Sequence, residues 1–189
     1  PVVMSRVAGR GLPFGVLVGA DRAACRSPRL SWAVRLRADI LSGVPSIIGG
    51  VFVYTLLVLT MKRFSALAGG VALGILMLPT VARTTEEMLR MVPDSLREAS
   101  LALGIPRWRT IVSIIIKTAS GGIMTGIMLA LARIAGETAP LLFTALNSRT
   151  WPTGLDKPVA SLPVQIYTYA IAPYADWHAQ AWAGSLVLV

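Results

Sequence analysis

Three charged residues, Lys117, Arg133 and Glu137, interrupt the long apolar stretch that runs from residue 110 to about residue 146. Arg133 and Glu137 are four positions apart, so we expect them to lie on one face of a membrane helix. A charge inside a bilayer costs about 2.5 to 3.5 kcal/mol on insertion scales, and it therefore usually faces a protein interior or an aqueous path. A guanidinium group binds phosphate-like oxyanions through a planar fork of donors. The pair thus indicates an anion path, and the alternative is an interfacial ion pair that serves helix packing.

The composition of the chain favours a membrane protein. Its 189 residues are 54% hydrophobic and 14% charged, with a mean hydropathy of +0.67 and a formal net charge of +9. The basic residues fall between apolar blocks instead of forming a stripe, which argues against nucleic-acid binding. Cys25 is the single cysteine, so the sequence offers neither an intrachain disulfide nor a cysteine metal site. It also contains no P-loop that would hold ATP.

His178 is the single histidine, which excludes a zinc site built on two histidines and leaves one candidate base for catalysis. The sequence therefore leaves open a second class of protein, an enzyme: an intramembrane hydrolase that uses a serine and His178. No Gly-x-Ser-x-Gly elbow accompanies any serine, which disfavours it. We expect the chain not to be an enzyme, and we predict no catalytic, cofactor-binding or metal-binding residue.

Four apolar segments are predicted to be membrane spans, because a helix needs about 20 mostly apolar residues to cross the bilayer. They cover residues 40–61, 64–82, 111–135 and 177–189. Positive residues gather in segments 21–39 and 83–109, which places both on the cytoplasmic side and the loop 147–176 outside. The chain begins without methionine and ends inside an apolar run, so we expect it to be incomplete.

Small residues recur at the spacing that lets membrane helices approach each other closely. The two pairs are Gly70 with Gly74 and Gly122 with Gly126. Lys117, near the start of the third span, is expected to extend its amine to the inner membrane interface.

The segment 83–109 carries both signs of charge and predicts a short amphipathic helix at the membrane surface. Pro93-Asp94-Ser95 is typical of a helix start, and Ser95 followed by Glu98 three residues later fits a capping box. Gly104 is placed to end the helix in a left-handed turn, and Pro106 breaks the chain before the next span. One face of the helix would carry Leu96, Ala99 and Leu103.

The residues from Glu98 onwards resemble the EAA loop of ABC-transporter permeases. The family pattern is E-A-A, three residues, G, nine residues and I-x-L-P. This chain reproduces that spacing with Glu98-Ala99-Ser100, Gly104 and an Ile-Ile-Ile-Lys run that ends at Lys117. Ser100 replaces the second alanine and Lys117 the proline. The resemblance implies a coupling helix that docks into a cytoplasmic ATPase, where Ala99 permits close contact and Glu98 and Gly104 hold the turn. The alternative, without the resemblance, is that Glu98 only caps its own helix.

A wider resemblance joins three stretches to the phosphate ABC-importer permeases, and in particular to their PstA family. The stretches are Arg-x-x-Gly-Glu-Thr-Ala-Pro-Leu-Leu-Phe-Thr-Ala at 133–145, Leu-Pro-Val-Gln-Ile-Tyr at 162–167 and Ser-Gly-Val-Pro-Ser-Ile at 42–47. The likeness covers the chain from about residue 29, and residues 1–28 match poorly. It implies an all-α polytopic helical bundle of the type I ABC importer (MetI-like) permease class, multi-pass in the bacterial inner membrane.

This resemblance implies half of a phosphate translocation pathway. Arg133, Glu137 and Thr138 would line the substrate path, with Glu137 neutralising Arg133 until an anion arrives. The implied partners are a second permease (PstC type), an ATPase dimer (PstB type) that binds ATP and Mg, a periplasmic phosphate-binding protein (PstS type) and the lipid membrane. The outer loop 147–176 would face the binding protein. A permease for another oxyanion, molybdate or sulfate, is the alternative within transport.

Overall fold

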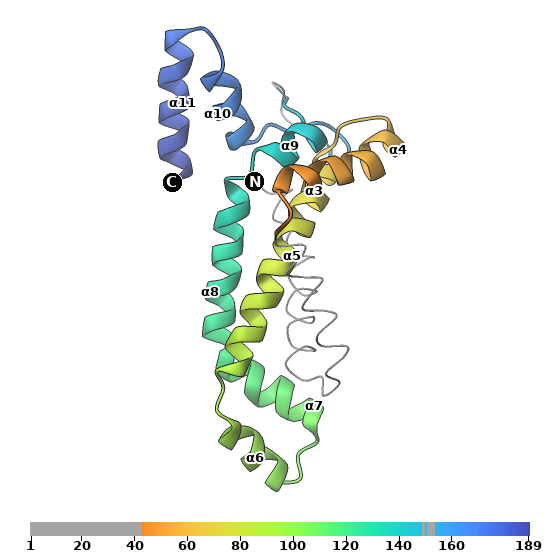
Figure 1. The fold of residues 1–189 in the computed structure, drawn as a ribbon, viewed down its shortest axis with the longest axis vertical. Helices are drawn as coiled ribbons and strands as arrows, with labels where there is room; N and C mark the ends of the chain where they lie inside the picture. Colours follow the sequence, from red (N-terminus) through yellow and green to blue (C-terminus); the bar gives the residue numbers. More distant parts are fainter. Residues whose placement is uncertain (1–42, 149, 151–153) are drawn as a thin grey trace. The chain divides into compact units, whose positions relative to one another are not determined.

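A computed structural model describes residues 43–148, 150 and 154–189, and the regular elements in this part of the chain are all helical (Figure 1). The elements are α3 (Ser46–Val53), η1 (Tyr54–Val58), α4 (Leu59–Met61), α5 (Ala66–Arg90), α6 (Asp94–Ala102), α7 (Arg107–Thr110), η2 (Ile111–Ile115), α8 (Ile116–Ala135), α9 (Ala139–Thr144), α10 (Leu162–Ala170) and α11 (Ala175–Leu188). The poorly matching segment 1–28 lies outside the described residues. Of the described residues, the first of two compact units holds 44–76 and 132–189, and the second holds 77–131.

The first apolar segment gives a shorter helix than the predicted span 40–61. Pro45 precedes the helix in an extended conformation, with φ −54° and ψ 137°. The helical run Ser46–Met61 passes through α3, η1 and α4 and ends at Lys62, which adopts the left-handed conformation with φ 52°. This run is shorter than the roughly 20 residues that a crossing helix needs. The described helix thus covers only part of the predicted span, whose residues 40–42 lie outside the described part of the chain.

Two helices of the described chain are long and apolar enough to cross a membrane. The first is α5, with 25 residues, and the second is the continuous helix Arg107–Ala135, with 29 residues, which consists of α7, η2 and α8. Helix α5 begins two residues after the start of the predicted span 64–82 and continues beyond its end, and the helix Arg107–Ala135 contains the predicted span 111–135. The predicted span 177–189 falls in α11, a helix of 14 residues.

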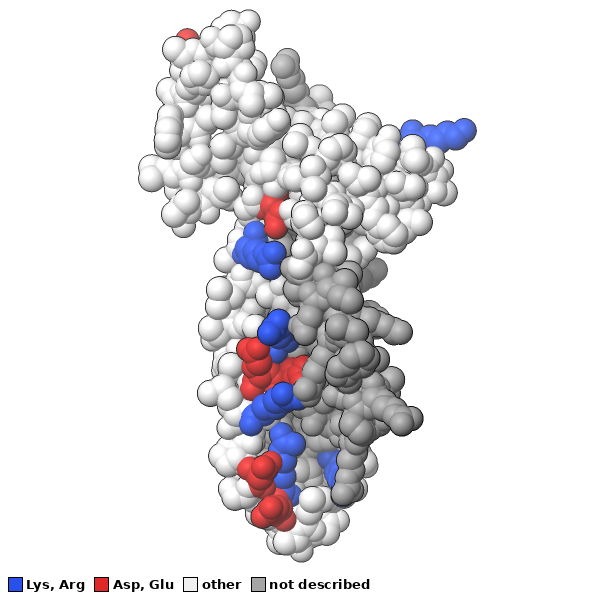
Figure 2. Space-filling view, in the orientation of Figure 1, with Lys and Arg blue, Asp and Glu red and all other residues white. Residues whose placement is uncertain are grey.

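The connection between α5 and α7 is shorter than the predicted loop 83–109. Helix α5 continues to Arg90, and pairs of opposite charge at helical spacing support its last turns. Arg83 Nε lies 3.4 Å from Glu87 Oε1, and Arg90 Nη2 lies 2.7 Å from Glu86 Oε1. In the view of Figure 2, charged side chains gather over the end of α5 and over α6 and α7, whereas α10 and α11 are almost free of colour. The polar residues predicted to form a loop are thus largely helical.

Glycines let α5 and α8 approach closely within the second unit. A Cβ atom added at Gly122 would collide with the side chain of Met88, and one added at Gly126 would lie 2.6 Å from Oγ1 of Thr84. Both pairs are spaced by four residues, which is the pattern expected for close contact of membrane helices. The prediction for Gly122 and Gly126 is confirmed.

Gly74, one residue of the other predicted pair, does not have this role. A Cβ atom added at Gly74 meets no described atom within 4 Å. Gly69 of the same helix is crowded, because a Cβ atom there would lie 2.9 Å from Cβ of Ala145 in the first unit. Close approach at the start of α5 therefore involves the residue before the predicted pair.

The contact at Gly126 makes a first testable prediction. Gly126→Leu should lower the free energy of unfolding by about 1–3 kcal/mol, because extra atoms in a filled interface force the helices apart. Gly121→Leu is the matched control on the same helix, since a Cβ atom at Gly121 meets no described atom within 4 Å. Thermal unfolding in detergent measures both variants. Equal losses for the two would show that the α5–α8 contact does not explain the effect.

Candidate functional site

The residues predicted to line an anion path lie where α8 ends in the first unit. Arg133 is in the last turn of α8, which ends at Ala135, while Glu137 and Thr138 lie in the link before α9. Backbone bonds typical of a closing turn follow, from the N–H of Gly136 to the Arg133 carbonyl at 3.3 Å and from the N–H of Glu137 to the Ile134 carbonyl at 3.2 Å. The prediction that Arg133 and Glu137 share one helix face is therefore wrong.

The break after Ala135 has a local cause in the sequence. Gly136 has a low helix propensity, and Pro140 has no N–H to bond to the Gly136 carbonyl. The ring of Pro140 would also clash with that carbonyl if one helix continued through both residues. A new helix with proline in its first turn avoids the clash, and this is how α9 begins.

The three residues differ in their exposure. Arg133 is exposed, whereas Glu137 and Thr138 are partly buried. A cation in the last turn of a helix is stabilised by the partial negative charge of the terminal carbonyls. The observed position therefore fits both an anion contact and a structural role for Arg133 at the helix end.

Helix α9, which follows the link in the stretch 133–145, is largely buried. In α9, Pro140, Leu141 and Thr144 are buried, and Thr144 Oγ1 donates a hydrogen bond to the Pro140 carbonyl at 2.7 Å. A Cβ atom added at Gly50 of α3 would lie 2.6 Å from the Pro140 Cα atom, so the two backbones touch. This packing anchors one end of the link that carries Glu137 and Thr138.

The N-terminus of α5 in the first unit is closed by hydrogen bonds. The Ser65 side chain accepts a bond from the N–H of Ala68 at 3.1 Å, as an N-cap residue does. Carbonyls of the outer loop accept the preceding N–H groups, with Ala66 bonded to Lys157 at 2.9 Å and Leu67 bonded to Leu155 at 3.0 Å. Sequence reasoning missed Ser65, although a serine directly before an apolar helix is an N-cap signal. This helix end has no free first-turn N–H groups to offer an anion.

The outer loop is held by further side-chain contacts. Arg63 Nη1 lies 3.1 Å from Asp156 Oδ2 in an exposed ion pair. The side-chain amide of Asn147 donates to Gln165 Oε1 at 2.8 Å and joins the end of α9 to α10. These contacts fix the described part of the predicted loop 147–176, and α10 lies within that loop as a helix.

The predicted coupling helix is observed as α6, and it begins at the predicted place, at Asp94. Its N-cap is Pro93, and no side-chain cap bond is present, so the predicted capping box of Ser95 and Glu98 is wrong. Glu98 and Ala99 are both exposed. They are therefore accessible to another subunit, which is a requirement of the predicted docking role.

The end of α6 follows the prediction closely. Gly104 has φ +74°, a conformation that a residue with a side chain adopts only with strain. The N–H of Ile105 bonds to the Ser100 carbonyl at 3.2 Å, and the N–H of Gly104 bonds to the Leu101 carbonyl at 3.0 Å. These two bonds make a Schellman motif. Gly104 thus fixes where α6 turns toward α7.

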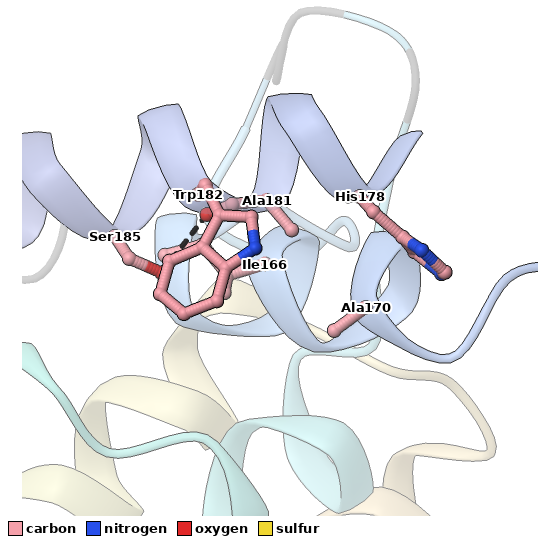
Figure 3. Close-up of a pocket in the computed structure, with 6 residues that line it drawn as sticks. All are labelled: Ile166, Ala170, His178, Ala181, Trp182 and Ser185. Atoms are coloured by element: carbon pink, nitrogen blue, oxygen red, sulfur yellow. Dashed lines mark hydrogen bonds between the residues drawn. The ribbon is translucent and has the colours of Figure 1, made fainter. Parts of the chain in front are cut away.

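A cavity of about 370 Å³ lies between α10 and α11 (Figure 3). It is lined by Ile166, Ala170, His178, Ala181, Trp182 and Ser185. Figure 3 shows His178 and Ser185 at opposite ends of the cavity. Ser185 Oγ donates to the Ala181 carbonyl at 2.9 Å, and Nε2 of His178 lies 2.7 Å from the Ala172 carbonyl. A hydrolase needs its nucleophile bonded to the base, so this arrangement does not support the hydrolase interpretation.

Comparison with known sequences places this chain among transport proteins. Residues 11–175 match the family described as binding-protein-dependent transport system inner membrane component. The phosphate transport system permease protein PstA of Yersinia pestis is 51% identical over 94% of this chain and 61% of its own length. The corresponding protein of Haemophilus influenzae is 48% identical over 94% of this chain and 64% of its own length. The chain thus spans about three-fifths of the length of these curated relatives.

Comparison with solved structures supports the fold. A chain from an inward-facing structure of the MetNI methionine ABC transporter superposes with a TM-score of 0.80 over 99% of this chain and 84% of its own length, at 19% sequence identity. A second crystal form of the same transporter gives a TM-score of 0.78. This likeness confirms the predicted fold class, an all-α membrane bundle of the MetI-like permease class.

Proposed function

Because this chain belongs to the family of binding-protein-dependent transport system inner membrane components, we propose that it is a permease subunit of an ATP-driven phosphate importer. The observation that carries the proposal is the identity of about half of all residues to phosphate permeases over 94% of the chain. A likeness of that extent covers both the coupling helix and the stretch around Arg133. The subunit itself would hydrolyse nothing, since ATP hydrolysis belongs to the partner ATPase.

The proposed substrate path uses the link between α8 and α9. Arg133 would bind the anion through its guanidinium fork, which matches two phosphate oxygens at once. Glu137 and Thr138 follow on a segment that the buried helix α9 anchors. Glu137 would neutralise the local positive charge while no anion is bound, and the Thr138 hydroxyl would add a hydrogen-bond donor. The first-turn N–H groups of α5 are already hydrogen-bonded, so they would not bind the anion. The anion-binding groups would therefore be the side chains of Arg133 and Thr138.

The proposed ATPase contact uses α6. Its exposed face carries Glu98 and Ala99, and its exposed apolar residues include Leu96 and Leu103, which are 39% and 79% exposed. Exposed apolar residues such as those of α6 are typical of a protein interface. Gly104 would set the angle at which α6 meets the ATPase. The complete transporter would add a second permease and a periplasmic phosphate-binding protein.

Uptake of labelled phosphate by cells that carry this subunit tests the proposal. Uptake should depend on the subunit and should persist in excess molybdate or sulfate, because a phosphate path rejects anions of different protonation and size. Inhibition of uptake by excess molybdate or sulfate would instead favour the alternative oxyanion permease. Absence of phosphate uptake, with the subunit present in the membrane beside its partners, would contradict the proposed substrate.

A further inference from the structure

The coupling helix α6 turns a polar face toward the rest of the second unit. Ser100 is its buried residue, with 2% of its surface exposed. The apolar side chains of Leu96, Leu101 and Leu103 are instead exposed. The core cluster of this unit is formed by residues of α5, α8 and the segments beside α6: Leu89, Val92, Ile115, Ala119 and Ile123. Apolar packing from α6 is thus a minor part of what holds this helix in place.

The first polar contact joins α6 to the end of α5. The Arg97 side chain donates from Nη2 to the Leu89 carbonyl at 2.9 Å. Helix α5 ends one residue later, so this carbonyl has no partner within the helix. A cation at this position also interacts favourably with the negative end of the helix dipole. Asp94, whose Oδ1 lies 3.6 Å from Arg97 Nε, helps to orient the guanidinium.

The second polar contact joins α6 to the start of α7. Oγ of Ser100 and Oγ1 of Thr110 lie 2.9 Å apart, and both residues are buried, with 2% and 3% of their surface exposed. Hydroxyl groups in a buried position contribute most when each has a partner, because an unpaired one keeps its full desolvation cost. The pair therefore ties α6 to the first turn of the 29-residue helix that contains α8.

Arg97 and Ser100 are three residues apart and thus lie on neighbouring positions of one helix face. We propose that they are positioning residues that transmit a displacement of α6 to α5 through the Leu89 carbonyl and to α7 through Thr110. The inference rests on the proposed function, since the displacement would come from the ATPase. Two separate bonds to the two flanking helices make α6 move as one body with both of them, so a push on α6 reaches the membrane helices.

The test measures coupling in the complete transporter, reconstituted in proteoliposomes with its ATPase, second permease and phosphate-loaded binding protein. The quantity is the amount of phosphate imported per ATP hydrolysed. Arg97→Gln should keep the ATPase bound and active, and it should lower this ratio about fivefold or more, the usual size of a lost coupling between sites. Arg97→Lys should recover part of the ratio, because it keeps a cationic donor. Arg107→Gln, which removes an exposed arginine of the same loop, should leave the ratio unchanged.

A second variant keeps the test decisive if Arg97→Gln does not assemble. Thr110→Val preserves side-chain shape and removes the hydroxyl that faces Ser100, and it should also lower the ratio. A native ratio in Thr110→Val and in every assembled Arg97 variant would overturn the proposal. Failure of the native chain to retain the ATPase would be a different result, because it would contradict the proposed function and remove the source of the displacement.

Discussion

Replacing Arg133 by glutamine should reduce phosphate uptake about a hundredfold or more. A hydrogen bond to a charged group contributes about 1.5–3 kcal/mol, and the guanidinium fork would supply two of them to the anion. Glutamine keeps a polar side chain, but it is shorter and has neither the charge nor the fork. Because Arg133 is exposed at the end of α8, the fold should tolerate the change. Initial rates of labelled phosphate uptake measure the effect.

Two further variants separate the fork from the charge. Arg133→Lys keeps the charge but loses the planar pair of donors, so its uptake should lie between that of the native chain and the glutamine variant. Arg63→Gln removes an arginine from the same compact unit and breaks an exposed ion pair, which usually contributes less than about 1 kcal/mol. Its uptake should stay close to native. Normal uptake by Arg133→Gln, with native amounts in the membrane, would exclude Arg133 from the substrate path.

Replacing Ala99 by arginine should detach the ATPase and abolish most transport. A small residue at the centre of a docking surface permits close contact, and a long charged side chain there would have to be buried unpaired or push the partner away. A cost of about 1–3 kcal/mol in docking corresponds to about a 5- to 150-fold loss of ATPase binding. Copurification of the ATPase with the permease measures docking directly, and uptake measures its consequence.

Leu101→Arg is the matched control on the same helix. Leu101 is exposed like Ala99, but it lies on roughly the opposite side, because successive helical residues are rotated by about 100°. It should retain the ATPase at near-native levels. If Ala99→Arg and Leu101→Arg lost the ATPase equally, or neither did, the face of α6 that carries Ala99 would not be the docking surface.

The parts of the site that the sequence predicted correctly depend on local rules. Gly104 was identifiable because glycine is the residue that a left-handed helix end favours, and the structure gives it φ +74° with both bonds of the motif. The contact of Gly122 and Gly126 was identifiable because small residues at this spacing allow close helix packing. Each prediction needs information from only a few neighbouring residues.

The parts that the sequence did not predict depend on competition between signals. The four-residue spacing of Arg133 and Glu137 suggested one helix face, but Gly136 and Pro140 end the helix between them. The Ser95 and Glu98 pair fits a capping box, yet the N-cap residue is Pro93 and no side-chain cap bond forms. The Lys157 carbonyl that closes α5 is distant in sequence from Ala66, so no local pattern indicates it.

The end of α8 at Ala135 has a consequence for how long cargo would stay bound. The terminal carbonyls of a helix carry roughly half a negative charge in total, and Arg133 lies in the last turn of α8. Under the proposed function, an anion at Arg133 would be attracted by the side chain and repelled by the helix end, which would shorten the time it stays bound. An importer that must release phosphate in every ATP cycle would benefit from such weak binding more than from tight binding.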